Sequence, residues 1–245
     1  MVSFVSVFVV AAMAGAQEKP AGGFKNTLSL GASMTDGNSE TLQLNASLVS
    51  EGEKPGLGSI RMGVEGNYGE STVNNNKETT VKNAKAFLNV KKTISERTFG
   101  SLDASCLRDE IAAINYRITV GPGLGAFLVK TEKASLSVEV GPTYVWEEVE
   151  VGGTTNVTDN YFAIRAFEKA SWAFSTGSKA WQSAECLPKA SDLNDFLLNT
   201  EIGVEAPLSA GVNIRLVLQD KYDSTPVDGK VPNDVALIAG VNIAL

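Results

Sequence analysis

The segment from Ile114 to Val151 constrains the fold most strongly, because apolar and polar residues alternate through it with a period of two. In its first half, one face collects Ile114, Tyr116, Ile118, Val120, Leu124, Ala126 and Leu128. A polar turn, KTEKAS, follows, and the pattern then resumes with Leu136, Val138, Val140, Tyr144 and Trp146 on one face. The segment therefore predicts a long antiparallel hairpin with one apolar face and one face that carries Arg, Glu and Gly.

The same alternation restarts along the chain from Phe24 to Leu245, and turn-rich clusters separate the restarts. We count twelve such segments, of which residues 180–187 form the least regular. In the eighth segment, residues 160–174, Glu168 and Lys169 interrupt the pattern and indicate a β-bulge. The sequence thus predicts an all-β fold, an antiparallel up-and-down barrel of about 12 strands, in which residues 24–245 form one domain.

The N-terminal stretch is typical of an export signal. Residues 1–16 contain an apolar run that ends in Ala14-Gly15-Ala16, the A-x-A form of a signal-peptidase site. We therefore predict that residues 1–16 are a signal peptide, that residues 17–23 form a linker, and that the mature chain is secreted across the inner membrane. A buried strand or helix is the alternative for residues 1–16, and the cleavage motif disfavours it.

Alternation alone does not separate a membrane barrel from a soluble one, because both have a period of two. Most segments here approach the ten residues that span the apolar part of an outer membrane. Short turns also alternate with longer connections such as GGTTNVTDN and TPVDGKVPN. These features favour a transmembrane barrel in the outer membrane of a Gram-negative bacterium, with both termini periplasmic, lipid around it, and the barrel-insertion machinery assembling it.

The aromatic residues support the same interpretation, since they gather near the segment ends as the two girdles of a membrane barrel do. The set at the loop ends is Tyr68, Tyr116, Tyr144, Trp146, Phe162 and Tyr222. The set at the turn ends is Phe24, Phe99, Trp172, Phe174 and Trp181. The charges also differ between the ends, because the longer connections are acidic and basic residues such as Lys91 and Lys179 fall at the turns.

The composition argues against several kinds of chemistry. The chain has no His and two Cys, so Ser-His and Cys-His nucleophiles and a cysteine zinc site are ruled out. A net charge of -7 disfavours nucleic acid as a partner.

Cys106 and Cys186 fall four strands apart, so we expect free, lipid-facing thiols. Gly121 to Gly125 lack the Lys of a phosphate loop and are better explained as strand glycines. We expect no enzyme, cofactor or metal, and the oligomeric state stays open.

If the apolar face contacts lipid, the charges on the other face line the lumen. The predicted lumen charges are Arg61, Glu65, Lys85, Asp103, Arg117, Glu139, Arg165, Glu185, Glu201, Glu205 and Arg215. At the outer mouth we place Glu147, Glu148 and Glu150.

Three functions fit this charge pattern. One is a narrow pore for small cationic or neutral solutes, whose acidic mouth concentrates cations. The second is a structural, non-conducting envelope barrel whose lumen is closed by Arg–Glu pairs. The third is a soluble periplasmic barrel that binds a small apolar ligand.

Four motifs carry a resemblance to a known family: GNSETLQLNASL, NYRITVGPGLGAFL, SLSVEVGPTYVWEE and YFAIRAF. With these motifs in order, Phe24 to Leu245 resembles the salt-induced outer-membrane proteins, a domain-of-unknown-function family of Gram-negative barrels. The resemblance implies an outer-membrane barrel of unassigned activity. The chain departs from the usual pattern of such barrels at its last residue, where Leu245 replaces a terminal aromatic.

Overall fold

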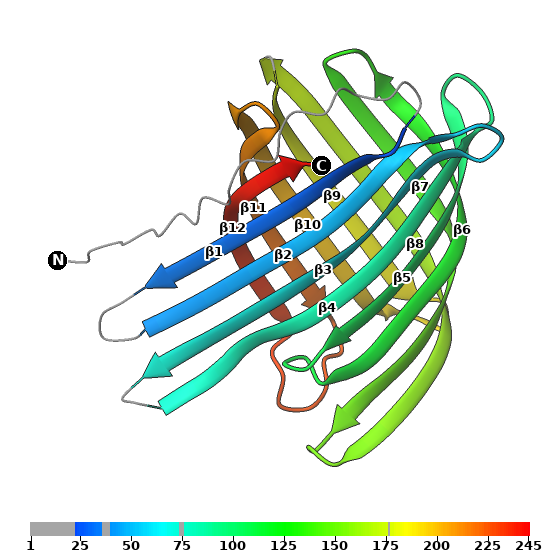
Figure 1. Ribbon diagram of the computed structural model, residues 1–245. Coiled ribbons are helices and arrows are strands. Elements are labelled where there is room, and N and C mark those ends of the chain that lie inside the picture. The colour runs from blue at the N-terminus through cyan, green and yellow to red at the C-terminus, as the bar shows by residue number, and fades with distance from the viewer. Residues whose placement is uncertain (1–22, 36–39, 74–75, 176) are drawn as a thin grey trace.

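A computed structural model describes residues 23–35, 40–73, 76–175 and 177–245. The described chain forms one closed barrel in which every strand is antiparallel to its neighbours and β1 meets β12 (Figure 1). The strands are β1 (Lys25–Thr35), β2 (Glu40–Lys54), β3 (Gly58–Val73), β4 (Asn76–Thr93), β5 (Thr98–Asp109), β6 (Ile114–Lys130), β7 (Ala134–Val151), β8 (Thr155–Ser175), β9 (Ser178–Lys189), β10 (Asp192–Ser209), β11 (Val212–Asp223) and β12 (Asn233–Ala244). The twelve-stranded up-and-down barrel predicted from the alternation is confirmed.

The predicted signal peptide, residues 1–16, lies outside the described residues, as does all of the predicted linker except Gly23. Within the described part of the chain, no helix is long and apolar enough to cross a membrane.

The apolar alternate residues point outward, as the period-two pattern predicts for a barrel in lipid. Val64, Leu124 and Val140 on this face are 55%, 65% and 56% exposed. The opposite face is buried and polar, with Ser29, Ser47, Ser101, Ser137, Glu139 and Thr143 inside. An apolar exterior around a polar interior is the arrangement of a membrane barrel and the reverse of a soluble one.

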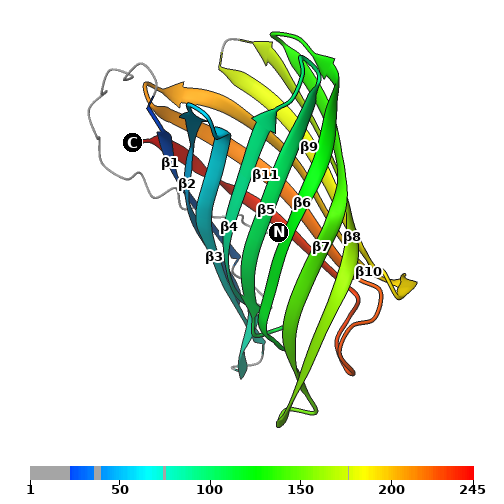
Figure 2. The same cartoon turned by 90° about the vertical axis from the view of Figure 1, so that its right-hand side faces the viewer.

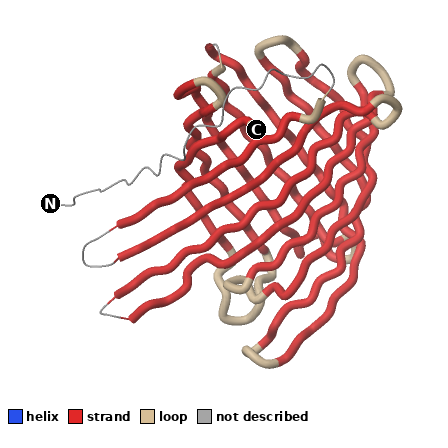
Figure 3. The backbone as a smooth tube through the Cα atoms, in the orientation of Figure 1, coloured by secondary structure: helices blue, strands red, loops and turns tan. Residues whose placement is uncertain are grey.

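The connections are shorter than the sequence predicts. TNVTDN belongs to β8, a strand of 21 residues, so only residues 152–154 connect β7 to β8. The predicted alternation of short turns with long loops is therefore wrong, except for the β11–β12 connection at residues 224–232. Polar residues extend β8 because the part of a strand that lies beyond the membrane does not need an apolar face. Figure 3 shows the small share of loop at either end of the barrel.

The β-bulge predicted at Glu168 and Lys169 is also wrong, because the pairing of β7 with β8 runs through both residues without a shift. Glu168 keeps the phase of Val138, its outward-facing partner on β7. Its carboxylate accepts a hydrogen bond from the side-chain amide of Gln182 on β9. Glu168 thus keeps the regular register and bonds to another polar side chain on the outer face.

The aromatic prediction holds for some residues and is wrong for others. Tyr144 packs edge-on against Trp146 and Phe162, and Trp172 packs against Phe174 toward the other end of β8. Phe99, however, is buried at 2% exposure. Trp181 also turns inward, and it does so over Gly203 on β10, where a Cβ atom would lie 2.1 Å from the indole ring. A glycine opposite a large side chain makes the room for it inside the barrel.

The interior is packed along one side. Val145, Ala163 and Leu187 form a buried cluster, with Tyr161 and Leu197 against it, so β7, β8, β9 and β10 share a small apolar core inside the wall. Figure 2 shows these strands as the tall, tilted part of the barrel. We call β5 to β10 the filled half and β11, β12 and β1 to β4 the hollow half.

The wall is weakest where β1 meets β12. The two strands pair only from Thr27 with Ala244 to Gly31 with Gly240, whereas β1 pairs with β2 along its whole length, up to Thr35 with Thr41. Among the described residues, no pair joins β1 to β12 beyond Gly31. In Figure 1 the two strands diverge from there toward the end of the barrel that carries the β11–β12 connection, which we call the distal end.

Candidate functional site: the lumen and its distal mouth

Arg165 on β8 is the centre of the largest ion-pair network in the lumen. Its guanidinium lies 2.5 Å from Glu185, 3.1 Å from Asp103 and 3.5 Å from Glu139. Because β5 and β8 are not neighbours in the barrel, the contact with Asp103 crosses the lumen. The structure therefore brings together four of the predicted lumen charges.

Lys91 joins this network, although its position in the sequence suggests a turn. It lies in β4, its ammonium binds Glu139, and it also lies over the rings of Phe99 and Phe167. The prediction that Lys91 belongs to a turn is wrong, because the inward phase of Lys85, Phe87 and Asn89 continues to residue 91. Following the alternation to the end of β4 is the signal that finds it.

A second network crosses the lumen closer to the distal end. Arg117 on β6 binds Glu147 on β7, and it lies 3.5 Å from Asp223 at the end of β11. The side chains of Arg117 and Glu147 are each 13% exposed. Two of the residues predicted for different places, the lumen and the mouth, are thus partners.

The remaining predicted lumen charges are spread along the wall. Glu201 accepts hydrogen bonds from Trp181 and Gln219, at 2.6 and 3.0 Å. Glu205 accepts from Asn213 and Asn242, at 2.6 and 2.7 Å, and lies 3.5 Å from Lys179.

Three predicted cations of the lumen are bound less tightly. Arg215 donates to Ser29 at 3.2 Å. Arg61 lies over the ring of Phe87, 4.7 Å from its centre. Lys85 is in register with Glu65, and among the described residues Arg61, Glu65 and Lys85 form no ion pair.

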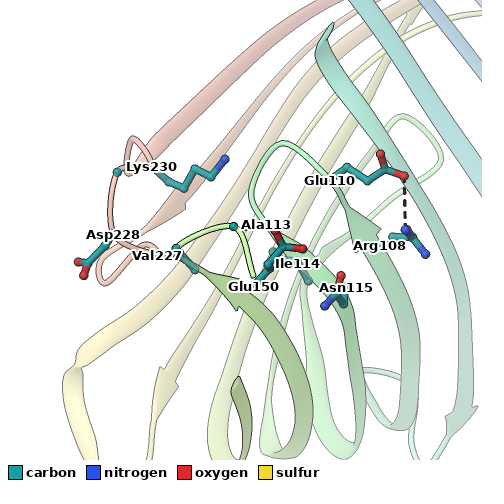
Figure 4. Close-up of a pocket in the computed structure, with 12 residues that line it drawn as sticks. Arg108, Glu110, Ala113, Ile114, Asn115, Glu150, Val227, Asp228 and Lys230 are labelled. Carbon is teal, nitrogen blue, oxygen red and sulfur yellow. Dashed lines mark ion pairs between the residues drawn. The ribbon is translucent and has the colours of Figure 1, made fainter. Parts of the chain in front are cut away.

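The predicted mouth residues do not form one ring. Glu147 is inside, paired with Arg117, whereas Glu148 accepts a hydrogen bond from Asn115 at 3.0 Å. Glu150 lines a cavity of about 530 Å³ between the connections of the distal end. Figure 4 shows this cavity, with Lys230 and Asp228 on the β11–β12 connection and the ion pair of Arg108 with Glu110 on the other side.

The turn after β5 shows the electrostatics of this mouth. Glu110 lies 2.7 Å from Lys82 and 3.5 Å from Arg108. The hydrogen bond from Lys82, more than the nearby positive charges, lowers the pKa of the Glu110 carboxyl below its ordinary value. Glu110 therefore stays ionised at the mouth at neutral pH.

A ladder of amides runs around the hollow half. The side chain of Asn45 donates to Asn67 at 2.6 Å, and that of Asn67 donates to Asn83 at 2.7 Å. Asn83 is in register with Asp109, whose carboxylate caps the backbone of the next turn. In the sequence, these asparagines are only separate polar positions on three strands. Our inference considered charged residues, so it did not predict the ladder.

The ladder faces a second cavity, of about 290 Å³, in the hollow half. Its polar lining includes Asn45, Asn67, Asn83, Asp109, Asp234 and Lys221. The side-chain oxygen of Asn45 is buried and has no hydrogen-bond partner. The hollow half thus offers acceptors, with little bulk to occupy the lumen.

The thiols match their prediction, since Cys106 and Cys186 are both free. Cys186 is in register with Leu198 and Ala166, and Cys106 is in register with Ile118, so both cysteines lie on the outer face.

Solved structures with a similar fold are membrane barrels. The NanC porin matches with a TM-score of 0.56 at 9% identity, over 90% of this chain and 100% of that one. The COG4313 outer membrane channel from Pseudomonas putida F1 matches at 0.54 and 9%, over 96% and 100%. The translocator domain of the autotransporter NalP from Neisseria meningitidis matches at 0.51 and 12%, over 90% and 87%. At such identities the likeness establishes the fold alone.

The sequence comparisons give the family. Among curated protein sequences, none matches this chain. A family model described as DUF481, protein of unknown function, matches residues 28–244, nearly the whole predicted barrel domain. The family of barrels of unknown function inferred from the four motifs is confirmed, while its link to salt induction stays a prediction. The chain belongs to the DUF481 family.

Proposed function

We propose that this protein is a narrow, non-enzymatic channel for small neutral or cationic solutes in the outer membrane of a Gram-negative bacterium. The observation that carries the proposal is the unequal filling of the lumen. Arginine networks and the apolar cluster occupy the filled half, and the cavity with the amide ladder occupies the hollow half. We place the solute path along that ladder, from the distal mouth toward the end with the termini, which we take to be periplasmic.

The lining supports this choice of solute. The oxygens of Asn45, Asp109 and Asp234 are acceptors, and Lys221 is the single cation in the lining of that cavity. A solute with hydroxyl or ammonium donors replaces its water there with protein acceptors, whereas an anion meets like charges. Selectivity in this channel therefore follows from hydrogen bonding and a modest excess of acidic groups.

A closed structural barrel is the second candidate, and a specific observation favours it. Arg165 and Arg117 both bind carboxylates across the lumen, from β8 to β5 and from β6 to β11. If these bridges also block the hollow half, the wild-type protein conducts no ions.

Conductance of the refolded protein in a planar bilayer separates the two candidates. The channel predicts small ohmic steps in the wild type, with cations favoured over anions. Asn67→Trp, which fills the cavity, should reduce the steps strongly, while Val64→Trp on the outer face of the same strand should leave them unchanged. Steps that appear only after Arg165→Ala or Arg117→Ala would support the closed barrel instead.

The proposal also includes export by the signal peptide, assembly by the barrel-insertion machinery, and lipid around the outer face. Heat-modifiable migration on gels and extraction only by detergent test this placement. Recovery of the mature protein in the soluble periplasmic fraction contradicts it.

A further inference from the structure

The cavity of the hollow half passes through the barrel wall. Its lining includes inward residues such as Asn45 and Ile238 and also residues of the outer face, Leu44, Tyr68 and Leu237. Leu44 and Leu237 are 45% and 57% exposed on the apolar surface. One continuous space thus contacts both the lumen and the surface that we place in lipid.

The passage lies where β1 and β12 separate. The last pair that joins them is Gly31 with Gly240, at the apex of the divergence. A Cβ atom at Gly240 would lie 2.2 Å from the carbonyl oxygen of Leu30, and one at Gly31 would lie 2.8 Å from that of Ala239. The two glycines let the strands cross closely at this point, and beyond it β12 lines the cavity from Asp234 to Ala239.

The lining changes character along this passage. Next to the outer surface it is apolar, with Leu44, Val235 and Leu237. Inside the wall it is polar, with the side-chain amides of Asn45, Asn67 and Asn83 and the carboxylates of Asp109 and Asp234. A molecule that satisfies both parts has an apolar tail and a headgroup that donates hydrogen bonds.

We propose that the opening between β1 and β12 is a lateral site for an amphipathic molecule with an apolar tail and a neutral or cationic, hydrogen-bond-donating headgroup. The headgroup lies on the amide ladder, and the tail leaves through the wall between Ala32 and Leu237. The inference rests on the proposed placement in the outer membrane but not on ion conduction.

Cross-linking the opening tests the proposal. In a background with Cys106→Ala and Cys186→Ala, the pair Ala32→Cys and Ala239→Cys continues the register one step beyond the apex and locks the strands together when oxidised. Leu30→Cys with Val241→Cys is the matched control, because these residues already pair. Each variant is compared with its own reduced form in lipid nanodiscs, so a failure to fold is seen before oxidation.

The probe is dodecylamine with a photoreactive diazirine at the end of its tail, followed by peptide mass spectrometry. We expect adducts near the opening, on β2 and β12, in the reduced protein, and their near-complete loss after oxidation of the 32–239 pair but not of the control. Competition by dodecylamine should exceed that by dodecanoate, because the carboxylates of Asp109 and Asp234 outnumber the single cation, Lys221, in the lining.

Three results overturn the inference: unchanged labelling after the lock, labelling spread evenly over the outer face, or an intermolecular disulfide that shows a second copy pairing with the open edge. Bilayer conductance of the same samples keeps the two proposals apart. Adducts at the opening in a barrel without conductance would refute the channel and support the lateral site.

Discussion

The filled and hollow halves of the barrel satisfy their inward polar groups in different ways. In the filled half, Arg165 gathers three carboxylates, and Val145, at 0% exposure, packs in the apolar cluster with Ala163 and Leu187. In the hollow half, Asn45, Asn67 and Asn83 bind one another along the wall. Side chains that reach across the lumen close it, whereas side chains that bind their neighbours on the wall leave it open. In the proposed channel, the direction of the contacts, more than the number of charges, decides where solute passes.

The largest effect should come from removing the centre of the filled half. Arg165→Ala leaves Asp103 and Glu185 without their cation, and it leaves Glu139, whose side chain is 1% exposed, with Lys91 alone. Breaking a buried pair in this way costs about 3–5 kcal/mol. Lys85→Ala in the hollow half is the control, because Lys85 has no ion pair among the described residues. Urea unfolding followed by gel migration measures the difference, and equal losses would remove the distinction between the halves.

Arginines on the outer face should have the next largest effect, and in both halves alike. Val140→Arg and Val64→Arg each place a charge in lipid, at a cost of about 2–4 kcal/mol near the middle of the membrane. Asn67→Arg faces the cavity and should cost much less. The yield of heat-modifiable protein in lipid vesicles reports all three variants. If Asn67→Arg fails as badly as the other two, the assignment of inside and outside in the hollow half is wrong.

The amide ladder should contribute less, because its groups are neutral. Asn67→Ala removes one donor and one acceptor, and each net hydrogen bond is worth about 1 kcal/mol. Asn89→Ala on β4 removes a bond, 2.6 Å long, to the carboxylate of Asp103 in the filled half and should cost more, since bonds to charged groups contribute about 1.5–3 kcal/mol. The reverse order of unfolding midpoints would show that the ladder, rather than the ion network, holds the wall.

Neutralising the mouth should change selectivity only modestly. Glu148→Gln with Glu150→Gln removes two charges at the distal end and should lower the preference for cations. The effect should fade at high salt, where the Debye length is about 3 Å at 1 M. Glu147→Gln differs, because it frees Arg117 inside the lumen and should lower cation selectivity at every salt concentration. Reversal potentials at two salt concentrations distinguish the two variants.

The smallest effect concerns pH at the turn after β5. Since the folded pKa of Glu110 is lowered, its stabilisation is complete above the ordinary carboxyl pKa and is lost as the pH falls through the lowered value. Lys82→Met removes the main cause and should flatten this part of the pH profile of unfolding, lowering stability at neutral pH and leaving it unchanged at a pH below the lowered value. If the pH profile of Lys82→Met keeps its acid slope, other carboxylates cause that slope.

The sequence by itself determined the barrel and its orientation toward lipid. Alternation with a period of two assigns each residue to a face, so the outward set with Val140 and the inward set with Arg165 follow from position alone. The same rule extends to Lys91, which binds Glu139 in the lumen as its odd position in β4 requires. The sequence does not determine the strand ends, because polar residues such as those before Tyr161 extend a strand beyond the membrane as readily as they form a loop.

Only the tertiary structure decided which inward residues meet. Arg165 reaches Asp103, 62 positions earlier in the chain, because the curvature of the barrel lets the inward side chains of β5 and β8 meet across β6 and β7. The inward turn of Trp181 depends in the same way on Gly203 across the strand pair. The gap beyond Gly31 arises because the first and last strands close the barrel and pair along only part of their length. How far those strands run together depends on the twist and tilt of the whole barrel, which no local pattern of residues encodes.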